Sequence, residues 1–221
     1  MKAGLILFSA AILFASCNGS DADEANATDQ QEVATATGGN SFTVDTTQST
    51  ITWTGYKPNG EHTGTFNISN GTLNADSTGI AAGSFTINVA SITDKDLSGE
   101  DKAKLEGHLK SADFFEVEKY PTAKFEVTKV EAYSVGSDTT KKSKLEGATH
   151  FISGNLTLKD QTKNITFPAK VSMTADQLTA NADFDIDRTN WNMNYKGPNN
   201  PQDWFIRKEV NIKLNVVAKK M

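Results

Sequence analysis

The sequence is short of cysteine, and this scarcity excludes several kinds of site. Cys17 is the only cysteine in 221 residues. The chain therefore cannot form an intrachain disulfide, and a zinc or haem site built on thiolates is not expected. Histidine is almost as rare, and His62, His108 and His150 each stand alone in their segments. None has metal-ligand spacing such as HxH or HExxH, so the pattern is typical of solvated or capping histidines.

Catalytic and nucleic-acid-binding signatures are also missing. No glycine-rich phosphate loop follows a strand and opens a helix, and no GxSxG motif is present. Asp183 and Asp185 share the polar face of one expected strand, which is more typical of solvation than of an acid–base pair. Acidic residues outnumber basic ones 27 to 22, and no basic patch of the nucleic-acid-binding type is found. We therefore predict a protein that is not an enzyme, with no nucleic-acid partner, no metal and no cofactor.

Long hydrophobic runs are limited to residues 3–14, which follow Lys2 and are too few to span a bilayer. The run ends in Leu-Phe-Ala-Ser directly before Cys17, which resembles the lipobox of a bacterial lipoprotein. We predict that residues 1–16 are a lipoprotein signal peptide. Acylated Cys17 would then anchor the protein to a membrane of the cell envelope, facing the periplasm or on the outer-membrane surface. The alternative is an ordinary signal peptide followed by a chance cysteine.

Large apolar side chains are nearly absent from residues 17–40. A segment of this kind cannot bury enough surface to offset the entropy of ordering it. We predict a flexible tether of about 20 residues, which reaches roughly 25 Å. The domain organisation expected from the sequence is thus a signal peptide at 1–16, a tether at 17–40 and one folded domain at 41–220.

Alternation of apolar and polar residues dominates the folded domain. Phe85, Ile87 and Val89, for example, alternate with small polar residues, as expected for strands with one buried face. The pattern gives about eight or nine strands, and short turns without a βαβ rhythm indicate antiparallel pairing. Such a sheet must form a sandwich or close into a barrel to bury its apolar face. Small polar residues on the other face argue against a membrane-spanning barrel.

One short helix is expected at residues 98–109, with Ser98 as its cap and acids in its first turn. It should lie across one end of the β-fold. The chain then places Phe114 and Phe115 side by side before a turn at Pro121. In a turn both rings can fold inward, either as a hydrophobic plug or as a lid over a binding site.

Three sequence blocks resemble the signature blocks of the YceI-like family. They are HLKSADFFEVEKYPTAKF at 108–125, SGNLTLKDQTKNITFPA at 153–169 and DRTNW at 187–191. The similarity extends over residues 41–218. It implies an all-β fold, an extended lipocalin-like antiparallel β-barrel of about eight strands with a short helix at one end. It also implies an exported protein that binds a long isoprenoid lipid in the barrel lumen. Two features depart from the family pattern: Trp191-Asn192 replaces Phe-Gly, and the loop 194–203 is long.

The leading hypothesis is therefore an envelope lipoprotein that binds or carries a polyisoprenoid, such as a quinone or prenyl phosphate. The alternative is a structural or stress-response lipoprotein with a packed, ligand-free barrel. The residues expected to line the lumen are Trp53, Phe66, Ile68, Phe85, Ile87, Phe125, Leu156, Phe167, Phe184, Ile186, Ile212 and Leu214. Those expected at the mouth are His108, Lys110, Phe114, Phe115, Arg188, Trp191 and Tyr195.

Arg188 is the strongest candidate for contact with a ligand head group, because a guanidinium can bind phosphate through two hydrogen bonds. Its alternative role is an ion pair with Asp187 or Glu209 that stabilises the mouth.

Overall fold

The computed structural model describes residues 22–57, 60–77, 79–133, 143–197 and 206–221. The predicted signal peptide and Cys17 lie outside these residues, as do parts of the expected loops at 132–149 and 187–203. None of the helices in the described ranges is long and apolar enough to cross a membrane.

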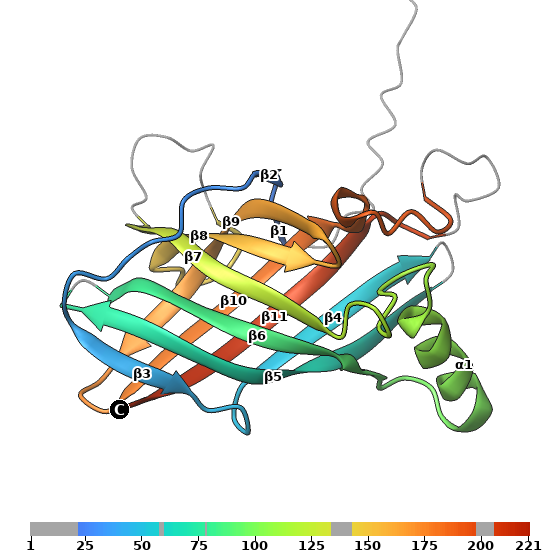
Figure 1. The fold of residues 1–221 in the computed structure, drawn as a ribbon, viewed down its shortest axis with the longest axis horizontal. Helices are drawn as coiled ribbons and strands as arrows, with labels where there is room; N and C mark the ends of the chain where they lie inside the picture. The colour runs from blue at the N-terminus through green and yellow to red at the C-terminus, as the bar shows by residue number, and fades with distance from the viewer. Residues whose placement is uncertain (1–21, 58–59, 78, 134–142, 198–205) are drawn as a thin grey trace, which may run out of the picture.

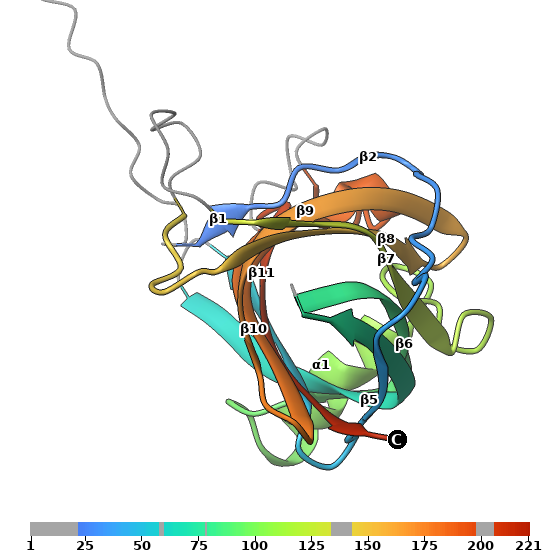
Figure 2. The same cartoon turned by 90° about the vertical axis from the view of Figure 1, so that its left-hand side faces the viewer.

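The described chain forms an antiparallel β-barrel (Figures 1 and 2). Its strands are β3 (Asn40–Val44), β4 (Thr50–Lys57), β5 (Gly60–Asp76), β6 (Gly79–Asp94), β7 (Thr122–Ala132), β8 (His150–Leu158), β9 (Gln161–Met173), β10 (Gln177–Asp187) and β11 (Glu209–Lys220). β3 and β4 both pair with β11 and with β5, so together they occupy one position in the sheet. Pairing of β10 with β9 closes the sheet. The result is an eight-position barrel, which confirms the fold expected from the sequence.

Alternation along the strands decides which side chains face inward. In β7, Ala123, Phe125 and Val127 are buried, while Thr122 and Lys124 are exposed. The register then brings inward residues of neighbouring strands together, because Phe125 pairs with Phe85 on one side and Leu156 on the other. The core therefore consists of layers of apolar side chains stacked along the barrel axis.

Helix α1 (Gly99–Lys110) follows β6 and packs at one end of the barrel, which we call the helical end (Figure 1). The 3-10 helix η2 (Arg188–Trp191) follows β10 at the same end. Glu100 and Asp101 occupy the first turn of α1, as expected from the helix dipole. Ser98 precedes the helix in an extended conformation, but its side chain makes no capping hydrogen bond. Ser98 therefore occupies the expected N-cap position, but the expected side-chain cap is not formed.

The chain before the barrel differs from the expected flexible tether, because residues 22–40 lie against the barrel wall. β1 (Asp23–Glu24) pairs with β10 and β2 (Thr28–Asp29) pairs with β9. β9 and β10 pair with each other only from Leu178 to Ala182 on the β10 side, so they separate toward the helical end. The N-terminal segment bridges this seam with backbone hydrogen bonds that the sheet leaves open there. Its composition gave no sign of this, because the bridge uses backbone groups rather than large side chains.

Two contacts fix the N-terminal segment in place. Ala25 is 2 % exposed, and its amide donates to the carbonyl of Asp185 at 2.8 Å. Further along, the Asn155 side chain donates to the Gln31 carbonyl at 2.7 Å and accepts from the Gln31 amide at 3.0 Å. Asn155 is fully buried, so these two bonds satisfy an amide that would otherwise be costly to bury.

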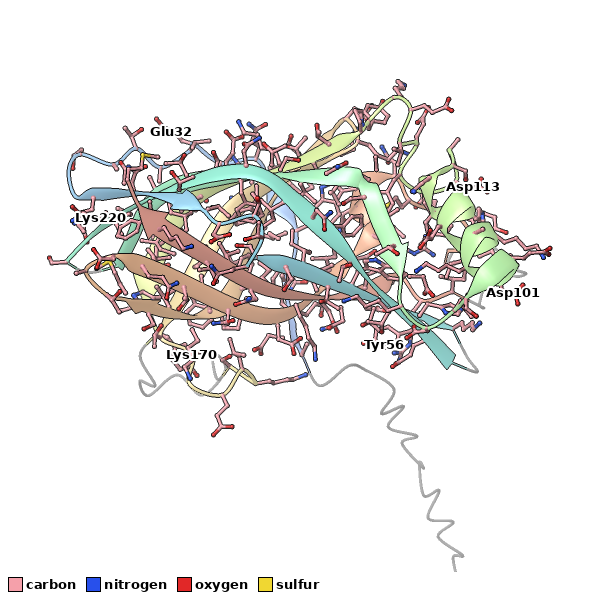
Figure 3. The ribbon with its side chains drawn as sticks, turned by 90° about the horizontal axis from the view of Figure 1, so that it is seen from below. Glu32, Tyr56, Asp101, Asp113, Lys170 and Lys220 are labelled. Carbon is pink, nitrogen blue, oxygen red and sulfur yellow. The ribbon has the colours of Figure 1, made fainter. Side chains whose placement is uncertain are left out.

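Charged side chains cover the outside of the barrel. Figure 3 shows Asp101 and Asp113 beside α1 at the helical end and Lys220 at the opposite end. We call that opposite end, near the C-terminus, the closed end.

Candidate functional site

An apolar cavity of about 210 Å³ lies inside the barrel. Inward side chains of the barrel strands form its walls, and Leu105 and Leu109 of α1 contribute at the helical end. The alternation of each strand is the cause, because every second residue from the neighbouring strands projects into the same space. The cavity can therefore surround hydrocarbon with apolar side chains.

Most of the residues predicted to line the lumen do so. They are Trp53, Phe66, Phe85, Ile87, Phe125, Leu156, Phe167, Phe184, Ile186, Ile212 and Leu214. Ile68 is an exception, because it is buried in the core at 3 % exposure and does not reach the cavity. Ile68 keeps the inward orientation that alternation predicts, and a register shift follows it in β5, between Ile68 and Asn70. The inward orientation is confirmed, and the role of these residues in lipid binding remains a prediction.

Four of the aromatic rings that line this cavity form a row across the barrel, and we call them the phenylalanine partition. Ring centroids are 5.4 Å apart for Phe85 and Phe125, 5.7 Å for Phe125 and Phe167, and 4.2 Å for Phe167 and Phe184. The first three also border a second cavity of about 30 Å³ towards the closed end. A Cβ atom on Gly154 would lie 2.2 Å from the Phe125 ring, so this glycine makes room for the partition.

Phe114 and Phe115 close the helical end of the cavity. Both rings line it, which confirms the prediction that the pair folds inward. Phe115 meets Phe66 edge to face at 5.5 Å, and Phe114 is only 8 % exposed. The segment after α1 therefore covers the cavity with aromatic surface.

Three predicted mouth residues lie around this cover and do not line the cavity. His108 Nε2 is 2.9 Å from an Asp113 carboxylate oxygen. The His108 ring packs against Tyr195 at 4.6 Å and against Phe114 at 5.1 Å. Lys110 ends α1 and is half-buried. His108 and Tyr195 thus tie the segment after α1 to the segment after η2, and direct contact of these three residues with a ligand inside the cavity is not what the structure shows.

Arg188 does line the cavity, and it is only 3 % exposed. Its Nε donates to the carbonyl of Arg207 at 3.1 Å, its Nη2 to Tyr195 at 2.8 Å, and its Nη1 to Met193. Burial lowers the pKa of the guanidinium. A guanidinium has five N–H groups, and these bonds use three of them. Arg188 therefore holds the loop after η2 in place and puts a positive charge at the cavity wall.

The ion pair expected between Arg188 and Asp187 or Glu209 is not found among the described residues. Asp187 instead accepts a hydrogen bond from Lys208 at 2.8 Å and caps η2 through the amide of Thr189 at 3.0 Å. Burial alone would raise the pKa of Asp187, but the bonds from Lys208 and Thr189 outweigh it and hold the pKa below its ordinary value. Lys208 is therefore the cation that pairs with Asp187 and Glu209, and no carboxylate of the described residues forms an ion pair with Arg188.

Two other expectations need correction. Trp191 is fully buried, and its Nε1 donates to the Leu156 carbonyl at 3.0 Å, so it anchors η2 rather than lining the mouth. Asp185 is not solvated as expected, because it is only 7 % exposed and accepts from Asn211 Nδ2 at 3.0 Å. β1 pairs with β10 at this point, and the extra strand removes Asp185 from water.

Some cavity-lining polar residues were missed by the sequence argument. They are Tyr56, Lys57, His62 and Arg207. His62 could have been found, because it lies four residues before Phe66 and so shares its face of the strand. Burial raises the pKa of Tyr56, and the Arg207 guanidinium lies 5.5 Å from the Tyr56 ring centre. Trp53 adds a further polar atom, because its Nε1 is buried and has no hydrogen-bond partner within the described ranges.

The model of the YceI-like domain family matches residues 42–218. A search of curated proteins found no match.

Solved structures share the fold. BcnA of Burkholderia cenocepacia is 22 % identical with a TM-score of 0.61, over 79 % of this chain and 98 % of that one. A polyisoprenoid binding domain from Saccharophagus degradans, implicated in plant cell wall breakdown, is 13 % identical with a TM-score of 0.55, over 86 % and 100 %. The Campylobacter jejuni YceI protein is 19 % identical with a TM-score of 0.50, over 71 % and 84 %.

Proposed function

The chain belongs to the YceI-like domain family, and from this premise we propose that it binds the hydrocarbon chain of an isoprenoid lipid in the barrel cavity. The observation that carries the proposal is the 210 Å³ apolar cavity at the centre of the barrel. A packed, ligand-free barrel would leave no such space. The polyisoprenoid-binding description of the Saccharophagus degradans domain, which has the same fold, supports the choice of ligand.

The size of the cavity limits how much of a chain can enter. Sites for small molecules usually occupy about 300–1,000 Å³, and this cavity is smaller. A long isoprenoid therefore requires the phenylalanine partition to move, or it leaves part of its chain at the mouth. Transfer from a bilayer to the cavity exchanges one apolar environment for another, so the gain of about 0.8 kcal/mol per methylene that applies to transfer from water largely cancels. The head group and closure of the mouth then decide which lipid is bound.

We propose Arg188 as the contact for a negatively charged head group. It is a buried cation that lines the cavity and has no carboxylate in contact within the described ranges. An anion such as a prenyl phosphate would place a counter-charge in direct contact with it, whereas a neutral quinone would not. The proposal is a binding function only, and it includes no catalytic step.

We also propose that acylated Cys17 holds the protein on a membrane of the cell envelope. The support is the lipobox-like sequence before Cys17. Cys17→Ala should release a soluble exported protein, measured by fractionation of membranes after expression. Persistent membrane association of the Cys17→Ala protein would show that another part of the chain or a partner holds it there.

Native mass spectrometry of protein purified without detergent tests the lipid proposal. The wild-type protein should carry a co-purifying isoprenoid lipid. Ala123→Phe fills the cavity, because Ala123 lines it and is only 3 % exposed, so lipid content should fall. Thr122→Phe is the matched control, because Thr122 is exposed and adjoins Ala123 on the same strand. A wild-type protein without lipid, or equal lipid content in the two variants, would favour the ligand-free structural role.

Paired binding measurements test the role of Arg188. Arg188→Met should weaken binding of a prenyl phosphate by about tenfold relative to an isoprenoid quinone, which corresponds to about 1.4 kcal/mol. Arg188→Lys keeps the charge and should retain most of this preference. Equal losses for both ligands in Arg188→Met would mean that Arg188 acts only by holding the loop after η2.

A further inference from the structure

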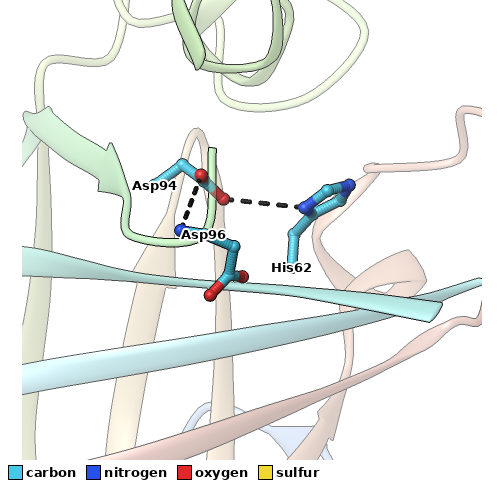
Figure 4. Close-up of side chains that lie close together, drawn as sticks. All are labelled: His62, Asp94 and Asp96. Carbon is cyan, nitrogen blue, oxygen red and sulfur yellow. Dashed lines mark hydrogen bonds and ion pairs between the residues drawn. The ribbon is translucent and has the colours of Figure 1, made fainter. Parts of the chain in front are cut away.

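Three potential metal ligands meet at the helical end of the barrel (Figure 4). His62 lies near the start of β5, Asp94 is the last residue of β6, and Asp96 follows in the turn to α1. The sheet brings them together, because Asp94 pairs with Gly64, two residues from His62. One ligand atom from each residue lies within 4.8 Å of the other two. We call this group the His62 cluster.

The strongest sign of a missing partner is on Asp94. This residue is fully buried, and its Oδ1 accepts from the amides of Asp96 at 3.0 Å and Leu97 at 2.7 Å. Its Oδ2 has no hydrogen-bond partner among the described residues, and neither does the buried Nδ1 of His62. The two atoms are 3.7 Å apart (Figure 4), which is within ion-pair distance but too far for a hydrogen bond. A buried carboxylate oxygen left in this state is costly, and it requires an explanation.

The same separation suits two ligands of one metal ion. A zinc ion lies about 2.1 Å from nitrogen and oxygen ligands, and at that distance from both atoms the ligand–metal–ligand angle is about 124°. Oδ1 of Asp94 accepts from two backbone amides, and these bonds already orient the carboxylate. The Asp96 carboxylate is likewise oriented, because its Oδ2 accepts from the amide of Thr63. Hydrogen bonds of this kind orient the ligands of metal sites in proteins.

We propose that His62, Asp94 and Asp96 bind a divalent first-row transition-metal ion, such as Zn²⁺. Bound to one imidazole nitrogen and two carboxylate oxygens, the divalent ion would neutralise both negative charges. The nitrogen ligand favours such an ion over Mg²⁺ and Ca²⁺, which prefer oxygen ligands only. Three protein ligands leave a fourth position for water or another ligand. His62 also lines the main cavity, so the metal site adjoins the cavity wall. The site does not depend on the lipid proposal.

Lys57 provides a test that distinguishes a metal site from a cluster that only stabilises the fold. Its Nζ is 3.1 Å from Nε2 of His62. When Nδ1 binds a metal, the hydrogen of a neutral imidazole is on Nε2, which then cannot accept from Lys57. The lysine must move away, and its positive charge also opposes the metal. Lys57→Ala should therefore strengthen metal binding, although it removes a contact from His62.

Isothermal titration of the chelator-treated full-length protein with ZnCl₂ tests the proposal. We expect one saturable site and a thermal midpoint that rises with Zn²⁺ concentration. His62→Ala and Asp94→Asn should each weaken Zn²⁺ binding by about tenfold or more. Asp94→Asn keeps the oxygen that accepts from the turn amides, so the fold should be retained. Asp96→Asn provides a third variant outside the barrel strands.

His108→Ala is the control for adventitious Zn²⁺ binding at the protein surface, because His108 and Asp113 form an exposed pair at 2.9 Å. Zn²⁺ affinity should be unchanged in His108→Ala and higher in Lys57→Ala. Three results would overturn the proposal: no saturable Zn²⁺ binding, equal affinity in His62→Ala and wild type, or equal binding of Mg²⁺. Lipid content, measured in the same samples by native mass spectrometry, separates failure of this site from failure of the lipid proposal.

Discussion

The two ends of the barrel differ in how tightly they are packed and in the charge of their buried side chains. At the closed end, the core consists of tightly packed apolar residues such as Phe42, Leu178 and Ala218, each at most 1 % exposed. The cavity there is only about 30 Å³. At the helical end the cavity is about 210 Å³, and the buried charged side chains Asp94, Asp185 and Arg188 lie in that half.

This contrast separates stability from binding. Buried charges cost folding free energy unless they are paired, and a cavity forfeits packing contacts. The closed end avoids both and can hold the sheet together. The helical end contains both buried charges and a cavity, as expected where a ligand or an ion is to be bound. The four predictions that follow test this division, from the largest expected effect to the smallest.

Phe42→Ala should cause the largest loss of stability, about 3–5 kcal/mol, because Phe42 is 1 % exposed in the packed end. Phe115→Ala at the helical end should cost less than half as much, because its ring borders the cavity and is only half-buried. The free energy of unfolding is measured in urea for both variants. Equal losses would mean that the two ends contribute alike to stability, against the division proposed here.

Phe125→Ala should cost about 3 kcal/mol and join the two cavities, because Phe125 borders both. A protein without this ring should bind longer isoprenoid chains than the wild type does. Native mass spectrometry with a mixture of chain lengths measures the preference. Val130→Ala, on the same strand but away from both cavities, is the control. An unchanged chain-length preference would show that the partition does not limit the ligand.

Ala25→Asp should destabilise the seam between β9 and β10 by about 2 kcal/mol. Ala25 is 2 % exposed beside Asp185, so a new carboxylate would be buried without a partner. Asn26→Asp, at the exposed neighbouring position, should leave the free energy of unfolding nearly unchanged. If both variants behave alike in urea unfolding, the N-terminal segment does not bridge the seam in solution.

Asp187→Asn should lower stability by about 1 kcal/mol at pH 7, because the hydrogen bond from Lys208 would lose its negative partner. The pKa of Asp187 is lowered in the folded protein, so its contribution is fully present above the ordinary carboxyl pKa of about 3.9. The contribution disappears as the pH falls through the folded value. The difference between variant and wild type in urea unfolding should therefore vanish in strong acid. Glu100→Gln, in an exposed pair with Lys104 at 3.6 Å, should show no difference at either pH.

Local patterns in the sequence determined the barrel and most of its inner surface. Period-two alternation requires only that one face be buried, so Phe66, Phe125 and Phe184 could be assigned to the lumen without knowledge of strand order. Alternation also placed Ile68 inward, but this residue lies in the core next to a register shift and does not line the cavity. The inward orientation of Phe114 and Phe115 was also predicted from local sequence, because burial is favoured for two adjacent large aromatic rings at a turn.

Only the tertiary structure decided the parts that depend on partners distant in the chain. Asp94 meets His62 because β6 pairs with β5, and neither residue carries a metal-binding motif of its own. Arg188 uses carbonyls rather than the expected carboxylates because Lys208 already neutralises Asp187. Residues 22–40 lack the apolar side chains that mark a folded segment, yet they pack on the barrel where β9 and β10 separate. Backbone groups left open by that separation supply the hydrogen bonds, and every residue type except proline carries the same donor, so composition cannot reveal where they are needed.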